Sequence, residues 1–563
     1  MHVQAPPDSL DSLDEDTRES VRQALWLDAL LPEDLPGGIQ DRLVSPENSN
    51  RAFGRRMQRR IREMLAAPDS FTPSYKQRYE TLLRNCDTLS AHQAYAMSVL
   101  LGQDNAKGYS PIPDVAGLRF PDAHPEDLQA QVGWYFCVGS CSDRKGKEYG
   151  VEVMFFRYAL LPPALARQFK LSDIENQVVE LHFAISVAGG RHHRMKPIVV
   201  AGTTGLIDYT TKPVSARMGK NVIRSLSETD LFPLRVEARG TCHEPDGSVE
   251  VGVELTLSSE KPPLLQGANG CSPCCGGVGT LYYSIPDLLL DATSSTLSIN
   301  GDQVELVDGK FWFDHQWGTG MIPAGSPRPA VLRAAGSLAE PGAGGWDWFM
   351  AHFSEGRALT FYSLHANEFR DFYSRSGPTA PGTMRVPISG KYMDPSGTVT
   401  EVAGVMEITR WIRSVTTPDA EQYPATRTWH PDRWEFTLED IPEDLRRFNM
   451  VPIVSTGQSG FFAFGAQYSE GAVYLQDEQG NDVGRGFAES VLYADARRTI
   501  VTLAGLPDTE TMMKTFEPER PSRLAKLWAT AYRVWPPNAK KLKQTLAQCL
   551  ANGLQAPAPK PRR

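Results

Sequence analysis

Alternation of apolar and polar side chains with a period of two is the feature that most constrains the fold of this chain. Across residues 249–257, every odd position from Val249 to Leu257 is apolar, and polar or small residues stand between them. A β-strand places successive side chains on opposite faces, whereas a helix repeats every ~3.6 residues. This segment is therefore predicted to be a strand with one buried face.

Short strands are predicted in two long stretches of the chain. Gly and Pro separate short apolar runs between residue 116 and about residue 320, and the same pattern returns between residue 330 and about residue 505. Many short strands with turn signals between them favour sandwiches and barrels, so two β-domains of similar size are the simplest partition. The other predicted strands span residues 149–158, 178–187, 280–285, 296–307, 358–365, 404–412, 433–438, 472–476 and 486–494.

The two ends of the chain have a different pattern. Between Leu10 and Leu31, apolar residues recur near helical spacing, which predicts a helix close to the N-terminus. At the other end, residues 514–563 carry eleven Lys and Arg against two Glu. The predicted organisation is mainly β, with a helical N-terminal region at 1–115, a first β-domain at 116–325, a second β-domain at 326–510 and a basic helical tail at 511–563.

The basic tail has two interpretations. Leu524, Trp528 and Trp535 follow helical spacing among the basic residues. A basic helix with Trp and Leu on one face is suited to the surface of an anionic membrane. The alternative is a helix packed on a barrel, followed by an end rich in Pro, Lys and Arg.

The overall composition argues against several classes of protein. A formal net charge of −9 gives no reason to expect binding to nucleic acid. The sequence has no run of about 18 apolar residues, and its first residues lack the pattern of a secretory signal. Eight cysteines in 563 residues are too few for a disulfide scaffold. A cytoplasmic protein is expected, with membrane association through the basic tail as the alternative.

Six short motifs follow one another along the two β stretches. They are Gly133-Trp134-Tyr135-Phe136, residues 262–267, Tyr282-Tyr283-Ser284, residues 309–318, Trp346-Asp347-Trp348-Phe349 and residues 484–489. In type and order they resemble the motifs of the carotenoid 1,2-hydratase and AttH-type family, although Gln316 stands where that family usually has Glu. The resemblance covers residues 125–500 and implies two consecutive lipocalin-like antiparallel β-barrels. Family members include carotenoid hydratases, a fungal phytoalexin hydratase and Diels–Alder cyclases, so the resemblance implies a fold more firmly than a reaction.

The motif at residues 309–318 contains the main candidate catalytic residues. In a strand, His315 and Trp317 point to one face and Asp314 points to the other. Hydration of an alkene needs a proton donor, such as a carboxylic acid that burial keeps protonated. Asp314 is one candidate acid, and Asp347 between two tryptophans is a second. His315 is expected to orient the acid, relay a proton or activate water, while the Trp317 indole stabilises a cation by roughly 0.5–2 kcal/mol.

A cyclase would need only a shaped apolar cavity and a hydrogen-bond donor, such as His315 or the amide of Gln316. A third interpretation gives the motif a structural role, in which it fixes the join between the barrels. The expected substrate-binding residues are Trp134, Trp312, Gln316, Trp346 and Trp348.

The sequence predicts an enzyme of secondary or isoprenoid metabolism that hydrates or cyclises a long hydrophobic substrate of the polyene or terpenoid type. The alternative is a lipid- or isoprenoid-binding protein without turnover. No cofactor is implied. No metal site is predicted either, because Cys271, Cys274 and Cys275 are irregularly spaced and no His pair accompanies them.

Overall fold

The computed structural model describes Tyr109 and most of residues 117–491. The gaps within this range are residues 160–162, 169–171, 175, 196–197, 203–205, 245, 268, 273–279, 319–344, 366–379, 414–428 and 464–465. The helical region predicted at 1–115, apart from Tyr109, and the basic tail predicted at 511–563 lie outside the described residues. No helix among the described residues is long and apolar enough to cross a membrane.

A fifteen-stranded antiparallel sheet forms the first barrel. Its hydrogen-bonded order is β4-β3-β2-β1-β15-β13-β10-β9-β8-β7-β6. Off this path, β5 pairs with β3, β11 and β12 pair with β13, and β14 pairs with β10 and β15, while the helix α5 (Pro163–Gln168) follows β2. The strands are β1 (Val132–Asp143), β2 (Glu148–Ala159), β3 (Gln177–Val187), β4 (His192–Arg194), β5 (Ile198–Ala201), β6 (Ile207–Thr211), β7 (Val214–Met218), β8 (Asn221–Ser225), β9 (Leu234–Glu244), β10 (Gly247–Ser258), β11 (Leu264–Leu265), β12 (Cys271–Ser272), β13 (Thr280–Leu290), β14 (Thr296–Ile299) and β15 (Asp302–Gly318).

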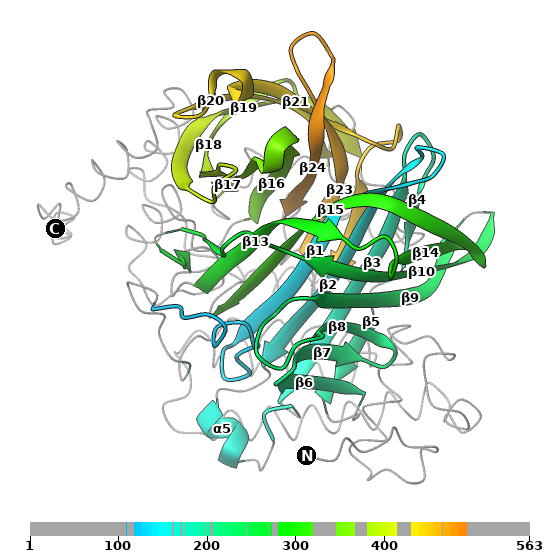
Figure 1. The fold of residues 1–563 in the computed structure, drawn as a ribbon, viewed down its shortest axis with the longest axis vertical. Helices are drawn as coiled ribbons and strands as arrows, with labels where there is room; N and C mark the ends of the chain where they lie inside the picture. Colours follow the sequence, from blue (N-terminus) through cyan, green and yellow to red (C-terminus); the bar gives the residue numbers. More distant parts are fainter. Residues whose placement is uncertain are drawn as a thin grey trace, which may run out of the picture.

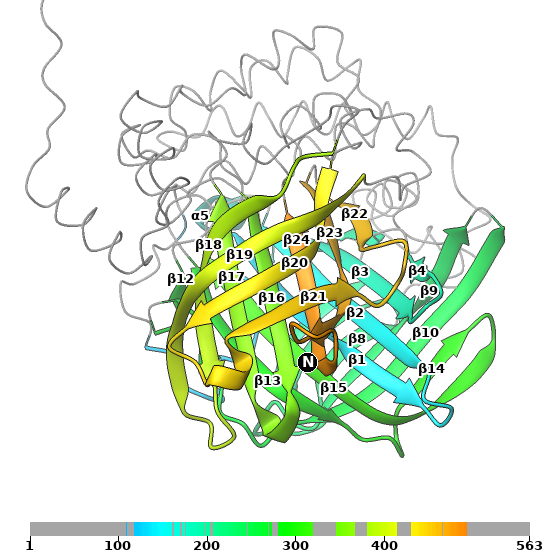
Figure 2. The ribbon, with the colours of Figure 1, turned by 90° about the horizontal axis from the view of Figure 1, so that it is seen from above.

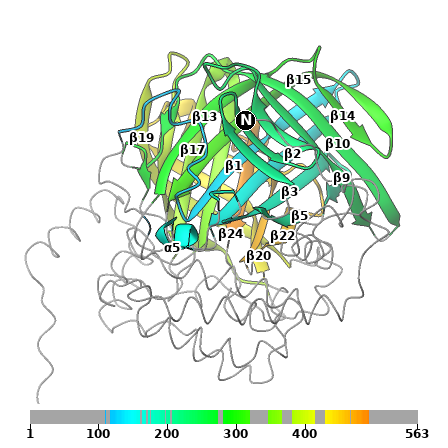
Figure 3. The ribbon, with the colours of Figure 1, turned by 90° about the horizontal axis from the view of Figure 1, so that it is seen from below.

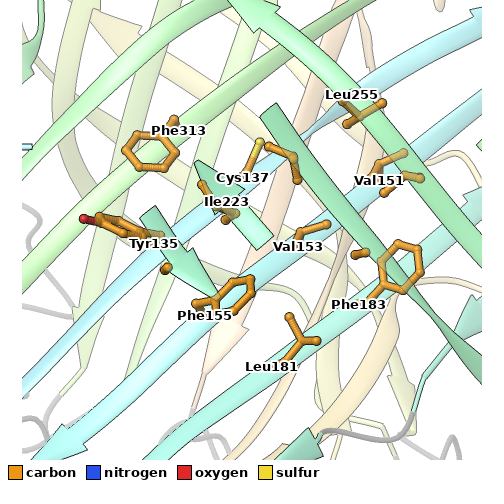
Figure 4. Close-up of a cluster of buried hydrophobic side chains, with 14 of the residues drawn as sticks. Tyr135, Cys137, Val151, Val153, Phe155, Leu181, Phe183, Ile223, Leu255 and Phe313 are labelled. Carbon is orange, nitrogen blue, oxygen red and sulfur yellow. The ribbon is translucent and has the colours of Figure 1, made fainter. Parts of the chain in front are cut away.

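The first sheet curls around a single core. Leu181 on β3 and Ile207 on β6 come from opposite ends of the strand order, yet both belong to the same buried cluster. Figure 4 shows Phe155 of β2, Leu181 of β3 and Leu255 of β10, all members of this cluster, among the side chains that fill the interior. The alternation predicted at residues 249–257 is confirmed, because the odd residues of β10 from 251 to 257 lie in this core.

One predicted strand is wrong in an informative way. Residues 296–307 form a hairpin and the start of a longer strand, because the chain reverses at Asn300-Gly301 between β14 and β15. Both turn residues have positive φ, 54° and 84°, as a tight two-residue hairpin turn requires. An Asn-Gly pair is typical of such a turn, so the turn signal outweighs the apolar run around it.

A nine-stranded antiparallel sheet forms the second barrel. Pairing of β21 with β23 closes a ring of eight strands, and β22 adds to β23. Figure 2 shows these strands around the second core. They are β16 (Gly345–Phe353), β17 (Ala358–His365), β18 (Met384–Met393), β19 (Val399–Arg413), β20 (Trp429–Glu439), β21 (Arg447–Pro452), β22 (Ser459–Ala463), β23 (Ala466–Gln476) and β24 (Asp482–Val491), with short 3-10 helices at Ser354–Gly356 and Glu443–Leu445. The chain therefore has the predicted fold class, two consecutive antiparallel β-barrels.

The outer faces of the two barrels pack directly on each other. Strands β1 and β2 contact β24 and β23 respectively, as the views in Figures 1 and 3 also indicate. The backbones approach each other closely at Gly150, where an added Cβ would lie 2.5 Å from the Cβ of Ala472. An ion pair also joins the two barrels, because Arg485 Nε and Nη2 donate to the two carboxylate oxygens of Glu148 at 2.7 Å each. This packing buries the outward-facing side chains between the barrels, Trp312 and Trp348 among them.

Candidate functional site

Strand β15 sends its side chains alternately into the first barrel and toward the second. Phe313, His315 and Trp317 point inward, and Phe313 and Trp317 belong to the first core. Trp312 and Asp314 point outward, where Trp312 meets Trp348 of the second barrel with ring centroids 6.2 Å apart. The predicted separation of Asp314 from His315 and Trp317 is confirmed, so the motif serves two different environments.

Asp314 lies between the barrels and accepts three hydrogen bonds. Ser284 Oγ and Trp312 Nε1 donate to Oδ1 at 2.5 and 2.6 Å, and Tyr282 OH donates to Oδ2 at 2.6 Å. Trp348 Nε1 donates in turn to Tyr282 OH at 3.0 Å. Burial outweighs the three donors and raises the pKa of Asp314 to about 7. Both oxygens are occupied, so this carboxyl group ties β13 and β15 to β16 of the second barrel.

His315 lies fully buried among aromatic rings inside the first barrel. Its imidazole stacks on Trp317 with centroids 4.2 Å apart and planes at 25°, and the Tyr135 ring lies at 4.6 Å. The Tyr283 ring meets it edge-on at 5.4 Å. One charged group reaches it, because Glu126 Oε2 lies 3.2 Å from Nε2. An imidazole, a carboxylate and an indole thus meet in an apolar interior.

Glu126 belongs to the segment that precedes β1, and Arg157 of β2 holds it in place. Arg157 Nη2 and Nε lie 2.7 and 2.8 Å from Glu126 Oε1. Burial opposes the ionisation of Glu126, but Arg157 and His315 together outweigh it and lower the pKa of the carboxyl group below its ordinary value. Glu126 is therefore a buried carboxylate with two basic partners.

Neither Glu126 nor Arg157 was predicted as a site residue. A signal for Arg157 was present, because it continues the inward-facing series of Val151, Val153 and Phe155 in β2. A charged residue at an inward position of an alternating strand indicates a buried ion pair. Glu126 had no comparable signal, since it lies outside any strand.

A second polar contact lies next to His315. His124 Nδ1 is 2.8 Å from Tyr283 OH, and Tyr135 OH donates to the His124 carbonyl at 2.7 Å. Burial, helped by the nearby charge of His315, lowers the pKa of His124 to about 4. His124 is consequently neutral at physiological pH and serves as a hydrogen-bonding group.

Asp347 lies in a third environment, inside the second barrel. It is fully buried, it precedes the core residue Phe349 by two positions, and it accepts a 2.7 Å hydrogen bond from Ser490 Oγ. Strand alternation therefore turns Asp347 away from Asp314, which faces the outside of the first barrel. The structure does not bring the three predicted acid–base residues together.

The predicted substrate-binding residues lie on outward-facing sides of strands. Trp134 stacks on Phe156 with centroids 5.2 Å apart and planes at 9°. Gln316, its partner in register, donates from Nε2 to Thr280 Oγ1 at 2.5 Å. Trp346 donates to Glu489 Oε2 at 3.0 Å. Together with Trp312 and Trp348, these residues lie on the opposite side of the first barrel wall from His315 and Trp317.

Further buried carboxyl groups gather between the barrels. Glu152 of β2 and Glu470 of β23 contact each other, and burial raises the pKa of both. Burial also raises the pKa of Glu489 to about 8, with the charges of Glu152, Asp314 and Asp347 adding to the effect. The interface is thus acidic, which the strand pattern alone does not indicate.

The cysteines have packing roles in the described part of the chain. Cys137 and Cys141 point into the first core, and burial raises the pKa of the Cys141 thiol to about 12. Cys271 forms β12, while Cys274 and Cys275 lie outside the described residues. Among the described residues, no cluster of three or more His, Cys, Asp or Glu is arranged to hold a metal ion.

Comparison with known proteins gives a family match and matches to solved structures. Residues 113–491 match the family model described as AttH-like. A putative AttH from Nitrosomonas europaea is 20% identical, with a TM-score of 0.45 over 68% of this chain and 100% of that one. Kievitone hydratase from Nectria haematococca is 11% identical, with a TM-score of 0.43 over 69% of this chain and 96% of that one. No curated protein matches the chain.

Proposed function

The chain belongs to the AttH-like family, and from that premise we propose that it is an enzyme of secondary or isoprenoid metabolism. Its substrate is a long hydrophobic molecule of the polyene or terpenoid type. The reaction adds water across an alkene or closes a ring by proton transfer inside the first barrel. The observation that carries the proposal is the buried His315 imidazole, stacked on Trp317 and 3.2 Å from Glu126.

The arrangement of these groups suits acid-initiated alkene chemistry. A buried imidazole beside a carboxylate can exchange a proton with a substrate atom. Protonation of an alkene leaves a cation on the neighbouring carbon, and the faces of Trp317, Tyr135 and Tyr283 each stabilise such a cation by roughly 0.5–2 kcal/mol. An apolar interior also limits the water that reaches the cation. If the cation captures one water molecule, the product is an alcohol; if it captures no water, the product is a ring or a new alkene.

Asp314 and Asp347 have different parts in the proposal. Asp314 has a pKa near neutrality, but both of its oxygens are engaged at the barrel interface. We assign it to holding β15 in place, in agreement with the structural interpretation of the motif. Asp347 remains a candidate acid for a substrate that reaches the second barrel.

The proposed chemistry needs no redox cofactor, because neither hydration nor cyclisation changes the overall oxidation state. The partners that we propose are a hydrophobic small molecule and, through residues 511–563, the surface of an anionic membrane. Nucleic acid is not among them. The proposed location is cytoplasmic.

The test is incubation of the purified protein with acyclic terpenoids and polyenes in heavy-oxygen water. Labelled alcohol indicates hydration, and an unlabelled isomer indicates cyclisation or isomerisation. His315→Gln is expected to abolish turnover. The matched control is His182→Gln, since His182 is equally buried but lies on the outer face of the first barrel against Tyr468. Equal turnover in wild type and a folded His315→Gln variant would rule out the assigned role.

A carrier of the same class of molecule is the second candidate function. It is supported by the apolar, aromatic interior of the first barrel, which includes Phe155, Phe183 and Phe313. A carrier would bind polyenes with unchanged affinity after His315→Gln and would release them unaltered. Single substitutions of Asp314, His315 and Asp347 that leave binding intact but stop turnover would favour the enzyme.

A further inference from the structure

Glu126 is the charged residue closest to the proposed reaction centre, and no sequence motif marks it. We propose that Glu126 is the positioning residue of the first barrel, which holds the Nε2 proton of His315 toward itself and thereby leaves Nδ1 as the nitrogen that exchanges a proton with the substrate. The inference rests on the proposed function for its chemistry. It rests on the buried contacts described below for its geometry.

The two oxygens of Glu126 have separate partners. Oε1 receives Arg157 Nε at 2.8 Å and Nη2 at 2.7 Å, whereas Oε2 lies 3.2 Å from His315 Nε2. The side chains of Glu126 and Arg157 are at most 1% exposed, so water does not compete for these contacts. The carboxylate is thus oriented by arginine and presents its other oxygen to the imidazole.

Arg157 is itself fixed by the backbone around it. Nη1 donates to the Ala130 carbonyl at 2.9 Å and to Gln177 Oε1 at 3.0 Å, and Nη2 donates to the Val132 carbonyl at 3.3 Å. A guanidinium group with all its branches engaged has little freedom to turn. Arg157 can therefore hold Glu126 in a single orientation against His315.

Gly133 provides the space for this ion pair. A Cβ at this position would lie 1.9 Å from Glu126 Oε1 and 2.9 Å from Arg157 Nη2. Such distances are far below van der Waals contact, so any other residue would displace the carboxylate. Gly133 also pairs in register with Trp317, which places the ion pair beside the indole that His315 stacks on.

The other nitrogen of His315 is left without a partner. Nδ1 is buried, makes no hydrogen bond in the described part of the chain and has no charged group in ion-pair distance, whereas Nε2, which also lacks a hydrogen bond of good geometry, has the Glu126 carboxylate 3.2 Å away. A buried polar atom without a partner is costly in a folded protein and is frequent at functional sites. The neighbouring His124 is committed to Tyr283 and does not fill this role.

In the proposed reaction, His315 Nδ1 both donates a proton to the substrate and takes one up again. In the imidazolium form, the Nδ1–H bond breaks and a C–H bond forms at one alkene carbon, which leaves the cation on the other carbon. The oxygen of a water molecule then bonds to that cation, and one water proton returns to Nδ1. Throughout, Nε2–H stays directed to Glu126, so the substrate gains one water and the protein is unchanged.

The experiment is nitrogen NMR of the full-length protein with ¹⁵N-labelled histidine, in which His315→Gln identifies the resonances. In neutral wild-type imidazole, the proton is expected on Nε2 by roughly tenfold or more, as a hydrogen bond to a charged group implies. Glu126→Gln is expected to reduce this preference severalfold. The matched control is Glu180→Gln, because Glu180 forms another fully buried pair with a histidine, 2.8 Å from His182 Nε2.

A second variant covers the case in which Glu126→Gln does not fold. Glu126→Asp keeps the charge for Arg157 but shortens the side chain by one methylene, so it is expected to weaken the preference at His315. A wild-type proton on Nδ1, or an unchanged preference in either folded variant, would overturn the proposal. The NMR result needs no substrate, so an absence of turnover in heavy-oxygen water would contradict the proposed function alone.

Discussion

The buried carboxyl group of Asp314 should make the protein less stable as the pH rises toward neutrality. Below about pH 3.8, both the folded and the unfolded states carry its proton. Between 3.8 and about 7 only the folded state does, because burial raises the pKa in that state. The folded state therefore binds more protons, and its stability falls with rising pH until the group ionises in both states. Asp314→Asn should remove this contribution.

The size of the effect follows from the shift. A change from 3.8 to about 7 corresponds to roughly 4 kcal/mol. Roughly 2–3 kcal/mol of this loss of stability should occur between pH 5 and pH 8.5, where the protein can be studied without acid unfolding. Asn keeps the shape of the side chain, and its oxygen can still accept from Ser284 and Trp312. The loss of charge is thus the main change.

The assay is urea unfolding of wild type and Asp314→Asn at several pH values from 5 to 8.5. The wild-type free energy of unfolding should fall more steeply with pH than that of the variant, by the amount above. Asp302→Asn is the matched control, because Asp302 is an exposed residue of the same strand. It should leave the slope unchanged.

Parallel pH profiles for wild type and Asp314→Asn would refute the reasoning. They would mean that Asp314 is ionised in the folded protein across this range, so that the three donors outweigh burial. A steeper slope in the variant would refute it as well, because the sign would then be opposite.

Three further substitutions test other parts of the structure. Gly133→Ala should lower the free energy of unfolding by at least about 1–3 kcal/mol in urea unfolding, because its Cβ would overlap Glu126; wild-type stability would contradict the packing. Trp348→Phe removes the donor to Tyr282 and should cost about 0.5–1.5 kcal/mol in the same assay, and no loss would indicate that this hydrogen bond contributes nothing. Glu470→Gln should raise the thermal midpoint at pH 8 but not at pH 5. Burial raises the pKa of Glu470 in the folded state, so the wild-type protein loses stability as the pH rises above the ordinary pKa of the carboxyl group, and the neutral Gln does not. An equal effect at both pH values would exclude titration of Glu470 as the cause.

Much of the fold could be predicted because alternation is a local property. The pattern in β10 and the turn at Asn300-Gly301 depend on neighbouring residues alone. The same rule correctly separated Asp314 from His315 and Trp317. What alternation cannot encode is which distant strand lies opposite each face.

The sequence by itself determined that the chain forms two β-domains, which the resemblance to the family specified as antiparallel barrels, and which residues share a face of the 309–318 strand. Only the tertiary structure decided that His315 meets Glu126 and Arg157 inside the first barrel, while Asp314 meets Tyr282 and Trp348 outside it. The physical reason is that a buried charge needs a partner, and that partner is chosen by the closure of the sheet rather than by spacing along the chain.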